Sequence, residues 1–153
     1  RHAINPKSFL DYVHDIDLKV LQPNSILDKA LEKLPGRKII FTNADVGHSV
    51  RVLEHLGISQ HFEDIFDIVA SDYIPKPQPK AYEMFIEQFG LNPMFTVMFE
   101  DMARNLKPAA DIGITTAWVR TNTLWGQENS KGEHVHYVID NLSSWLNNVA
   151  SSY

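Results

Sequence analysis

Short apolar runs alternate with segments of helical period along most of this chain, and this alternation limits the possible fold more than any other feature. Apolar or β-branched runs of strand length occur at residues 38–41, 65–69, 95–99, 115–119 and 135–139. Apolar residues recur at helical spacing at 26–34, 46–56, 79–89, 106–112 and 142–149. About five repeats of strand and helix predict an α/β fold with a mainly parallel sheet and helices on both faces.

The size and composition of the chain exclude several classes of function. Its 153 residues, 44% hydrophobic and 22% charged, suit one soluble domain with a real core. A net charge of -5 argues against binding a nucleic-acid polymer, and no apolar run approaches the ~20 residues of a membrane helix. The absence of cysteine excludes disulfides, thiolate metal sites and cysteine catalysis, and it fits the cytoplasmic location that we expect.

Polar side chains follow three of the predicted strands. Thr42 and Asn43 come directly after the first strand, and Glu100 and Asp101 directly after the third. Lys76 stands between two prolines in the loop after the second strand. Ligands of open α/β sheets bind outside the carboxyl ends of the strands. We therefore expect the three clusters to converge on one rim, although they lie far apart in the sequence.

The residue types in these clusters suit the binding of phosphate and a divalent cation. The Thr42 hydroxyl and the N–H or amide of Asn43 can donate to a phosphate oxygen, and Lys76 can supply a fixed positive charge. Asp101, with Glu100 nearby, can hold Mg²⁺, which prefers carboxylate oxygen. No obvious nucleophile accompanies these groups.

Asn105 lies one helical turn after Asp101, so we expect it to orient Lys76 through a hydrogen bond.

Each cluster also has a simpler structural interpretation. A Thr-Asn pair at a strand end is usually a turn or a helix cap, and a lysine between prolines is usually a solvated loop residue. An acidic pair after a strand can cap the next helix. The order and spacing of all three clusters favour a joint site. A module that binds phosphate, metal or a partner without catalysis remains the alternative from another class.

The three clusters resemble the motifs of the haloacid dehalogenase superfamily of phosphatases. In that family a Thr or Ser ends the second core strand, a Lys follows the third, and an acidic motif follows the fourth. Thr42, Lys76 and the Glu100-Asp101 pair match these motifs in order, over a stretch from about Leu21 to the C-terminus. The phrases at 34–38, 41–43, 75–77 and 99–106 are similar to the pyrimidine 5′-nucleotidase group in particular.

The resemblance implies a Rossmann-like three-layer sandwich with a mainly parallel sheet of about five strands. It also implies Mg²⁺-dependent hydrolysis of (pyrimidine) nucleoside 5′-monophosphates through an aspartyl-phosphate intermediate in the full-length enzyme. The partner is then a small phosphorylated metabolite, neither a nucleic-acid polymer nor a membrane. Thr42, Asn43 and Lys76 would bind the phosphate, Asp101 and Glu100 the metal, and Asn105 would support them. Dehalogenase chemistry on a related scaffold is disfavoured, because the acidic pair suits Mg²⁺ and a phosphate.

The sequence departs from the family at its beginning. The family opens with an Asp-x-Asp motif on its first core strand, which supplies the nucleophile, the acid/base and a metal ligand, and an inserted helical cap follows. The one Asp-x-Asp here is Asp15-Ile16-Asp17, which follows a segment of helical pattern, and Lys19 stands where the motif has Thr or Val. We therefore expect residues 1–21 to be the tail of the cap and its linker, and 22–153 to be the core domain.

On this interpretation the core is truncated at its N-terminus. The fragment then lacks its nucleophile and is inactive, and an exposed apolar sheet edge invites homodimerisation or strand exchange. The alternative is a phosphatase without a cap that uses Asp15 as nucleophile and Asp17 as acid/base.

Overall fold

The structure, a computed structural model, describes residues 5–152 as an α/β fold. Its helices are α1 (Pro6–Val13), α2 (Ser25–Lys33), α3 (Val46–Leu56), α4 (Pro79–Phe89), α5 (Leu106–Asp111) and α6 (Leu142–Ala150). Its strands are β1 (Ile39–Phe41), β2 (Asp64–Phe66), β3 (Val97–Glu100), β4 (Thr115–Val119) and β5 (Tyr137–Ile139). Short 3-10 turns lie at η1 (Ser59–His61), η2 (Pro93–Phe95) and η3 (Ala103–Asn105). None of the helices in residues 5–152 is long and apolar enough to cross a membrane.

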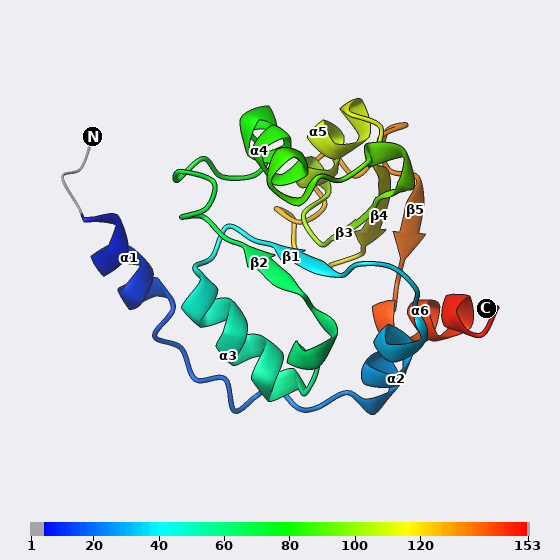
Figure 1. Ribbon diagram of the computed structural model, residues 1–153, viewed down its shortest axis with the longest axis horizontal. Coiled ribbons are helices and arrows are strands. Elements are labelled where there is room, and N and C mark those ends of the chain that lie inside the picture. The colour runs from blue at the N-terminus through cyan, green and yellow to red at the C-terminus, as the bar shows by residue number, and fades with distance from the viewer. Residues whose placement is uncertain (1–4, 153) are drawn as a thin grey trace.

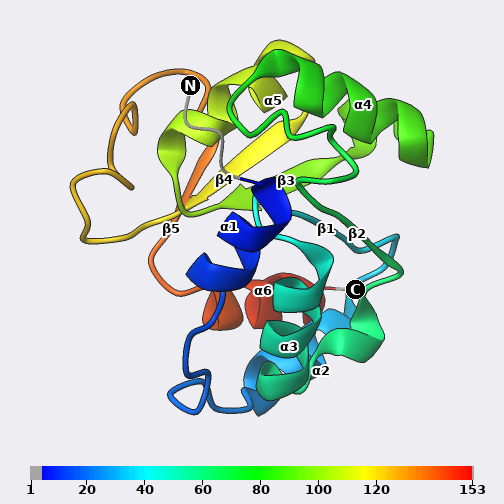
Figure 2. The same ribbon diagram turned by 90° about the vertical axis from the view of Figure 1, so that its left-hand side faces the viewer.

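The elements form three layers, as the alternation predicted. Helices α4 and α5 cover one face of the strands, and α2, α3 and α6 cover the other (Figure 1). Helix α1 lies apart from both layers, outermost on the side that faces the viewer in Figure 2. The predicted α/β, Rossmann-like architecture is confirmed.

Side-chain caps, a first-turn proline and closing glycines mark where several helices begin and end. The Asp45 side chain accepts a 2.7 Å hydrogen bond from the His48 N–H and starts α3, and Gly57 at φ 69° closes it. Helix α4 has Pro79 in its first turn and ends at Gly90. Asn141 caps α6 by accepting from a backbone N–H. The boundaries follow the sequence signals because caps act locally.

The five strands are parallel, but they form two hydrogen-bonded sheets instead of the single sheet that the sequence suggested. Strand β1 pairs with β2, so that Phe41 lies opposite Phe66. The second sheet has the order β3-β4-β5 and places Glu100 opposite Trp118. Within residues 5–152, no ladder joins β1 to β3. These two strands are the inner edges of the two sheets.

Both core layers extend across both sheets. On one face, Ile40 of β1 and Phe99 of β3 pack against the same buried cluster, which belongs mainly to α2, α3 and α6. On the opposite face, Phe41 and Met98 pack against a cluster from α4, α5 and their surroundings. The sheets therefore belong to one hydrophobic unit, although hydrogen bonds do not join them.

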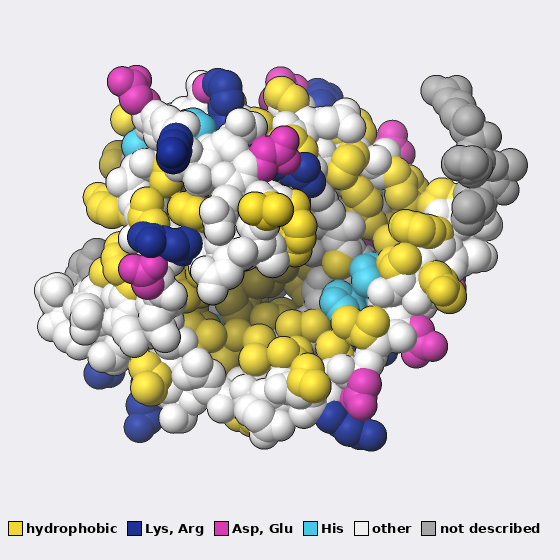
Figure 3. Space-filling model, turned by 180° about the vertical axis from the view of Figure 1, so that it is seen from behind, with side chains coloured by type: hydrophobic (Ala, Val, Ile, Leu, Met, Phe, Trp, Pro, Cys, Tyr) yellow, Lys and Arg dark blue, Asp and Glu magenta, His cyan; other side chains and the backbone are white. Residues whose placement is uncertain are grey.

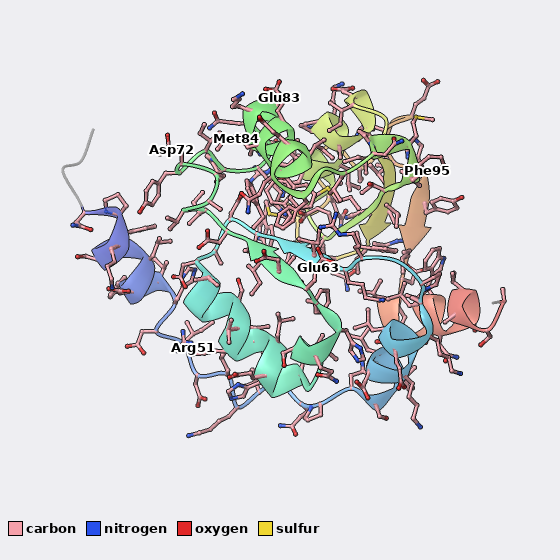
Figure 4. The ribbon with its side chains drawn as sticks, in the orientation of Figure 1. Arg51, Glu63, Asp72, Glu83, Met84 and Phe95 are labelled. Carbon is pink, nitrogen blue, oxygen red and sulfur yellow. The ribbon has the colours of Figure 1, made fainter. Side chains whose placement is uncertain are left out.

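Four of the five predicted strands begin later or end earlier in the structure, and two of them have a local cause. The segment 65–69 is in strand form only to Phe66, because the Asp67 carboxylate accepts the N–H groups of Val46, Val69 and Ala70 at 2.8 to 3.1 Å and turns the chain. The segment 95–99 begins its strand at Val97, because η2 occupies the preceding residues. Phe95, at the end of η2, is 90% exposed and points away from the molecule (Figure 4).

The N-terminal segment has little packing of its own. No residue of α1 is buried, and Asn5 caps the helix. Arg51 of α3, labelled in Figure 4, donates a 2.7 Å hydrogen bond to the His14 carbonyl and ties the end of α1 to the core. Of the expected cap tail at 1–21, residues 1–4 lie outside the described part of the chain. The boundary between 21 and 22 stays a prediction.

Candidate functional site

A groove of about 520 Å³ lies between the carboxyl ends of β1 and β3. From behind, the molecule is hollowed near its centre, and hydrophobic side chains form the floor of the hollow (Figure 3). The polar residues that line the groove include six singled out in the sequence: Thr42, Asn43, Lys76, Glu100, Asp101 and Asn105. The predicted convergence of the three clusters is therefore present in the structure.

Thr42 follows β1 and keeps a free proton for a ligand. Its N–H donates to the Phe66 carbonyl at 2.9 Å, which extends the pairing with β2. Its hydroxyl oxygen accepts the Ala44 N–H at 3.0 Å, as in a turn. The hydroxyl proton remains able to donate, so the turn and the predicted phosphate contact are compatible at this residue.

The Asn43 side chain fixes the Lys76 backbone in a way that the sequence analysis missed. The Asn43 carbonyl oxygen accepts the Lys76 N–H at 2.8 Å, and its amide donates to the Lys76 carbonyl at 3.1 Å. This reciprocal pair joins the loops after β1 and β2. The Asn43 backbone N–H is then the group left for the predicted contact with phosphate.

The Lys76 ammonium bridges the two inner strands. Its Nζ lies 2.8 Å from the Phe41 carbonyl oxygen and 2.5 Å from Glu100 Oε2. It also lies 4.9 Å from the centre of the Phe41 ring. The Lys76 and Glu100 side chains are only 8% and 7% exposed, so Lys76 is not a solvated loop residue. The carboxyl ends of β1 and β3 meet at this cation.

The prediction that Asn105 orients Lys76 is wrong. Lys76 is held by Phe41 and Glu100, and no hydrogen bond joins it to Asn105 in the described structure. The physical reason is that η3, and not a regular α-helical turn, ends at Asn105. The Asn105 backbone carbonyl accepts the Tyr82 hydroxyl at 2.5 Å, whereas its side-chain oxygen is buried without a partner.

The pKa values of the two acidic residues shift in opposite directions. Burial tends to raise the pKa of Glu100, but the Lys76 ammonium and hydrogen bonds from Asp101, Lys76 and the Met102 N–H outweigh it and lower that pKa. Burial, together with the neighbouring Glu100 carboxylate, raises the pKa of Asp101. Glu100 therefore carries the charge that neutralises Lys76, and Asp101 holds its proton more tightly than usual.

The oxygen groups of the groove suit Mg²⁺, which takes part of its ligands from water and substrate, better than a metal ion bound by protein ligands alone. Within residues 5–152, no group of three or more His, Cys, Asp or Glu could hold a metal ion. Mg²⁺ usually binds one or two carboxylates and takes its other ligands from water and substrate phosphate. Asp101 and Glu100 supply such carboxylates, and the unpartnered Asn105 oxygen adds a buried acceptor in the same groove.

The structure does not bring Asp15 and Asp17 to the groove. Neither carboxylate is among its lining residues, and Asp17 accepts the Lys19 N–H at 2.9 Å in a local turn. Asp15 lines a second pocket, of about 590 Å³, together with Asp45. Apart from Asp101, no described aspartate lines the groove that holds Lys76.

A histidine pair in the second pocket was not found from the sequence. The rings of His14 and His48 stack with centres 4.4 Å apart, and His14 Nδ1 lies 2.6 Å from Asp45 Oδ2. Burial lowers the pKa of His48, and the neighbouring His14 and Arg51 lower it further. The sequence signal that could have pointed to this contact is Asp45, an acidic residue at the N-cap of α3 that is able to bind the segment after α1.

Comparison with known sequences gives matches to hydrolases. The family profile of haloacid dehalogenase-like hydrolases matches residues 10–113. Bifunctional epoxide hydrolase 2 of Rattus norvegicus is 35% identical over 63 residues, which cover 41% of this chain and 11% of that protein. The Mus musculus protein is 34% identical over 62 residues, again 11% of its length. The chain thus matches only about a tenth of these curated relatives.

Solved structures with the same fold include proteins of two activities. An L-2-haloacid dehalogenase from Xanthobacter autotrophicus superposes with a TM-score of 0.63 at 16% identity, over 82% of this chain and 60% of that one. A HAD phosphatase from Thermococcus onnurineus superposes with a TM-score of 0.62 at 19% identity, over 96% of this chain and 65% of that one. At these identities the likeness establishes the fold alone.

Proposed function

This chain belongs to the haloacid dehalogenase-like hydrolases, and from that membership we propose that it supplies the phosphate- and metal-binding side of a Mg²⁺-dependent phosphomonoesterase site. One observation carries the proposal. Lys76, Thr42 and the acidic pair come from three separate parts of the chain and line a single groove. A donor, a buried cation and two carboxylates at the carboxyl ends of parallel strands are what a phosphate with a divalent cation requires.

Each residue has one task in this proposal. The Thr42 hydroxyl and the Asn43 backbone N–H donate to the oxygens of the transferring phosphate. Lys76 neutralises the charge on those oxygens, and the Asn43 amide holds the Lys76 backbone in place. Asp101 ligates Mg²⁺, with Glu100 nearby. When bound, the metal ion supplies further positive charge at the phosphate.

The substrate class belongs to the proposal as well. We assign nucleoside 5′-monophosphates, with a preference for pyrimidines, from the similarity of the phrases around Thr42, Lys76 and Asp101 to the pyrimidine 5′-nucleotidase group. The full-length enzyme would act through an aspartyl-phosphate intermediate. The nucleophilic carboxylate of that reaction is not among the groove residues of the described chain, where Asp101 serves the metal and Glu100 is paired with Lys76.

That arrangement favours a second candidate function for the chain by itself. With both groove carboxylates engaged, the described residues can bind phosphate and metal without turning over a substrate. The second candidate is thus a binding module of the same groove. Hydrolysis is the property that separates it from the leading proposal.

Calorimetric titration of the chain with inorganic phosphate, with and without Mg²⁺, tests the site directly. We expect Mg²⁺ to strengthen phosphate binding, and Asp101→Asn to weaken the Mg²⁺-dependent binding at least about tenfold. Asp111→Asn is the matched control, because Asp111 lies on α5 and pairs with Lys107 at an exposed position. A phosphate affinity that is unchanged by Mg²⁺ and by Asp101→Asn would contradict the proposal.

Assays of hydrolysis separate the candidate functions. The chain is incubated with Mg²⁺ and one of three substrates: uridine 5′-monophosphate, adenosine 5′-monophosphate or 2-chloropropionate. Release of phosphate or chloride is measured. Phosphate binding without turnover supports the binding module for this chain. Release of phosphate that is abolished by Asp15→Asn would instead support the alternative with Asp15 as nucleophile. Release of chloride would favour dehalogenase chemistry.

A further inference from the structure

The turn that follows β3, from Asp101 to Asn105, carries two oxygen donors of the groove on a short stretch of backbone. Asp101 and Asn105 both line the groove, and the Asn105 side-chain oxygen is buried without a partner in the described structure. Between them lies η3, in which the Asn105 N–H donates to the Met102 carbonyl at 2.9 Å. A 3-10 turn has poorer hydrogen-bond geometry than an α-helix, so contacts from outside decide how firmly this turn is held.

A tryptophan of β4 holds the first residue of the turn. The Trp118 indole N–H donates to the Asp101 backbone carbonyl at 2.9 Å. Trp118 is only 6% exposed, lies opposite Glu100 in the strand register and belongs to the same buried cluster as Leu106. The indole is therefore fixed by the core, and its hydrogen bond fixes the peptide group that follows the Asp101 side chain.

A tyrosine of α4 holds the last residue of the turn. The Tyr82 hydroxyl donates to the Asn105 backbone carbonyl at 2.5 Å, and Tyr82 is 1% exposed. The Tyr82 ring also packs edge-on against Phe41, with ring centres 5.2 Å apart. Burial, together with the Glu100 carboxylate, raises the pKa of Tyr82 above its ordinary value, so the hydroxyl keeps its proton and remains a donor.

The loop after β4 holds the middle of the turn. The Gly126 carbonyl accepts the Ala103 N–H at 3.0 Å, and Arg104 pairs with Glu128 of the same loop at 3.1 Å. A side chain at Gly126 would meet Thr121, whose Cγ2 would lie 2.6 Å from the added Cβ. The backbone of the turn is thus held from outside at its first, third and fifth residues.

These backbone contacts leave the Asp101 carboxylate and the Asn105 amide in the groove. Mg²⁺ requires near-octahedral geometry with short oxygen contacts, so its affinity depends on how precisely a carboxylate is placed. We propose that Trp118 and Tyr82 are positioning residues, which fix the backbone of the turn so that Asp101 faces the metal. This role rests on the proposed function, because it requires Mg²⁺ to bind at Asp101.

The test compares binding of Mg²⁺ alone to the wild-type chain, Tyr82→Phe and Trp118→Phe. Tyr82→Phe removes a single oxygen, and Trp118→Phe removes the indole donor. Matched controls are Tyr137→Phe on β5 and Trp145→Phe on α6, the same changes at side chains that form no hydrogen bond with the turn within residues 5–152. Magnesium chloride is titrated into the ¹⁵N-labelled proteins, and the backbone and indole N–H signals are followed by NMR.

We expect Tyr82→Phe and Trp118→Phe each to weaken Mg²⁺ binding at least about tenfold, the usual effect of losing a hydrogen bond behind a metal ligand, and the controls to leave it unchanged. In the wild-type chain the Trp118 indole signal should shift as Mg²⁺ binds, whereas the Trp145 signal should not. Binding of inorganic phosphate without Mg²⁺ should be the same in all variants, because it depends on Thr42 and Lys76.

Every other outcome also decides. Unchanged Mg²⁺ affinity in both variants, with binding by the wild-type chain, would overturn the positioning role and leave the proposed function intact. Equal weakening of Mg²⁺ and phosphate binding would overturn the role as well, because the whole fold would then have loosened. Weakening in one variant alone would support that residue and overturn the other, and Tyr82→Phe decides by itself if Trp118→Phe does not fold. No response of the wild-type chain to Mg²⁺ would overturn the metal site of the proposed function together with this role, so the two failures are distinguishable.

Discussion

Lys76 and Glu100 form a buried ion pair that stabilises the fold only while both charges are present. Removing two charges from water costs several kcal/mol, and their attraction in the interior offsets this cost only while both remain. Their 2.5 Å contact and low exposure place them in that regime. The Phe41 carbonyl and the Met102 N–H complete their hydrogen bonding. The stability of the site therefore depends on residues from β1, β3 and the loops after β2 and β3.

We predict that Lys76→Met lowers the free energy of unfolding by about 3–5 kcal/mol, because it leaves the Glu100 carboxylate buried without a counter-charge. Urea denaturation followed by far-UV circular dichroism measures the change. Combining Lys76→Met with Glu100→Gln should recover a large part of the loss, because the unpaired charge is gone. Losses that simply add in the double variant would show that the two residues are not coupled.

The lowered pKa of Glu100 makes the free energy of unfolding depend on pH in the acid range. A carboxyl group with a lowered pKa in the folded state stabilises the fold above its ordinary pKa of 4.5, and this contribution is lost as the pH falls through the lowered value. We predict that the wild-type chain loses stability below about pH 4.5 more steeply than Glu100→Gln does. Urea midpoints between pH 3 and 7 test this. Parallel curves for the two proteins would remove Glu100 from the acid response.

At the scale of elements, the start of α3 forms hydrogen bonds with residues from two other parts of the chain. Its cap residue Asp45 accepts the His48 N–H and also contacts the His14 ring, which belongs to the segment after α1. The Asp67 carboxylate after β2 accepts the Val46 N–H in the same first turn. One helix terminus thus joins the segments that follow α1 and β2.

We predict that Asp45→Ala costs about 0.5–2 kcal/mol of stability, the usual effect of losing an N-cap. Asp45→Asn is the matched control, because it keeps an acceptor for the His48 N–H and should cost less. Thermal unfolding measures both. Equal losses in the two variants would show that the charge of Asp45, and not its cap, carries the effect.

The contribution of Asp45 to stability also depends on pH. Burial tends to raise its pKa, but hydrogen bonds from the His48 N–H and from His14 outweigh burial and lower it. Its contribution is therefore present above its ordinary pKa of 3.8 and lost as the pH falls through the lowered value. The difference in stability between wild type and Asp45→Asn should shrink over that acid range, as unfolding midpoints would show.

At the scale of the whole molecule, hydrophobic packing joins the two sheets, which no backbone hydrogen bonds between β1 and β3 connect in the described residues. Both core layers contact β1 as well as β3. Phe66 of β2 is fully buried and packs against Phe41 and Phe85, with ring centres 5.3 and 5.6 Å away. The two sheets share these layers, so we expect them to unfold together.

We predict one cooperative transition with equal opening free energies for the amides of Ile40 in β1 and Ala117 in β4, measured by hydrogen exchange. Phe66→Ala, in the smaller sheet, should cost about 3–5 kcal/mol and lower protection in both sheets alike. Loss of protection in β1 and β2 alone would show that each sheet opens as a separate unit.

The family of the chain and most of its elements could be predicted because their causes are local. Periodicity and caps fix the helices, and Thr42 and Asp101 sit directly after strands, where the backbone itself positions them. Lys76 lies further on, in the loop between β2 and α4. The errors occurred where a side chain reaches across the fold. Asn105 was assigned to Lys76 from its spacing along one helical turn, but a 3-10 turn and the closer Phe41 carbonyl decide the contact. The early end of β2 depends on Asp67, which accepts the Val46 N–H of α3 as well as the N–H groups of Val69 and Ala70.

The sequence by itself determined the alternation of parallel strands and helices and the residue types at the rim, because both follow from local order along the chain. Only the tertiary structure decided that the strands form two sheets with a groove between them, and that Lys76 is shared between Phe41 and Glu100. Strand order and ion pairing depend on which distant groups meet. That outcome is set by packing of both core layers and by burial, which raises the cost of every unpaired charge.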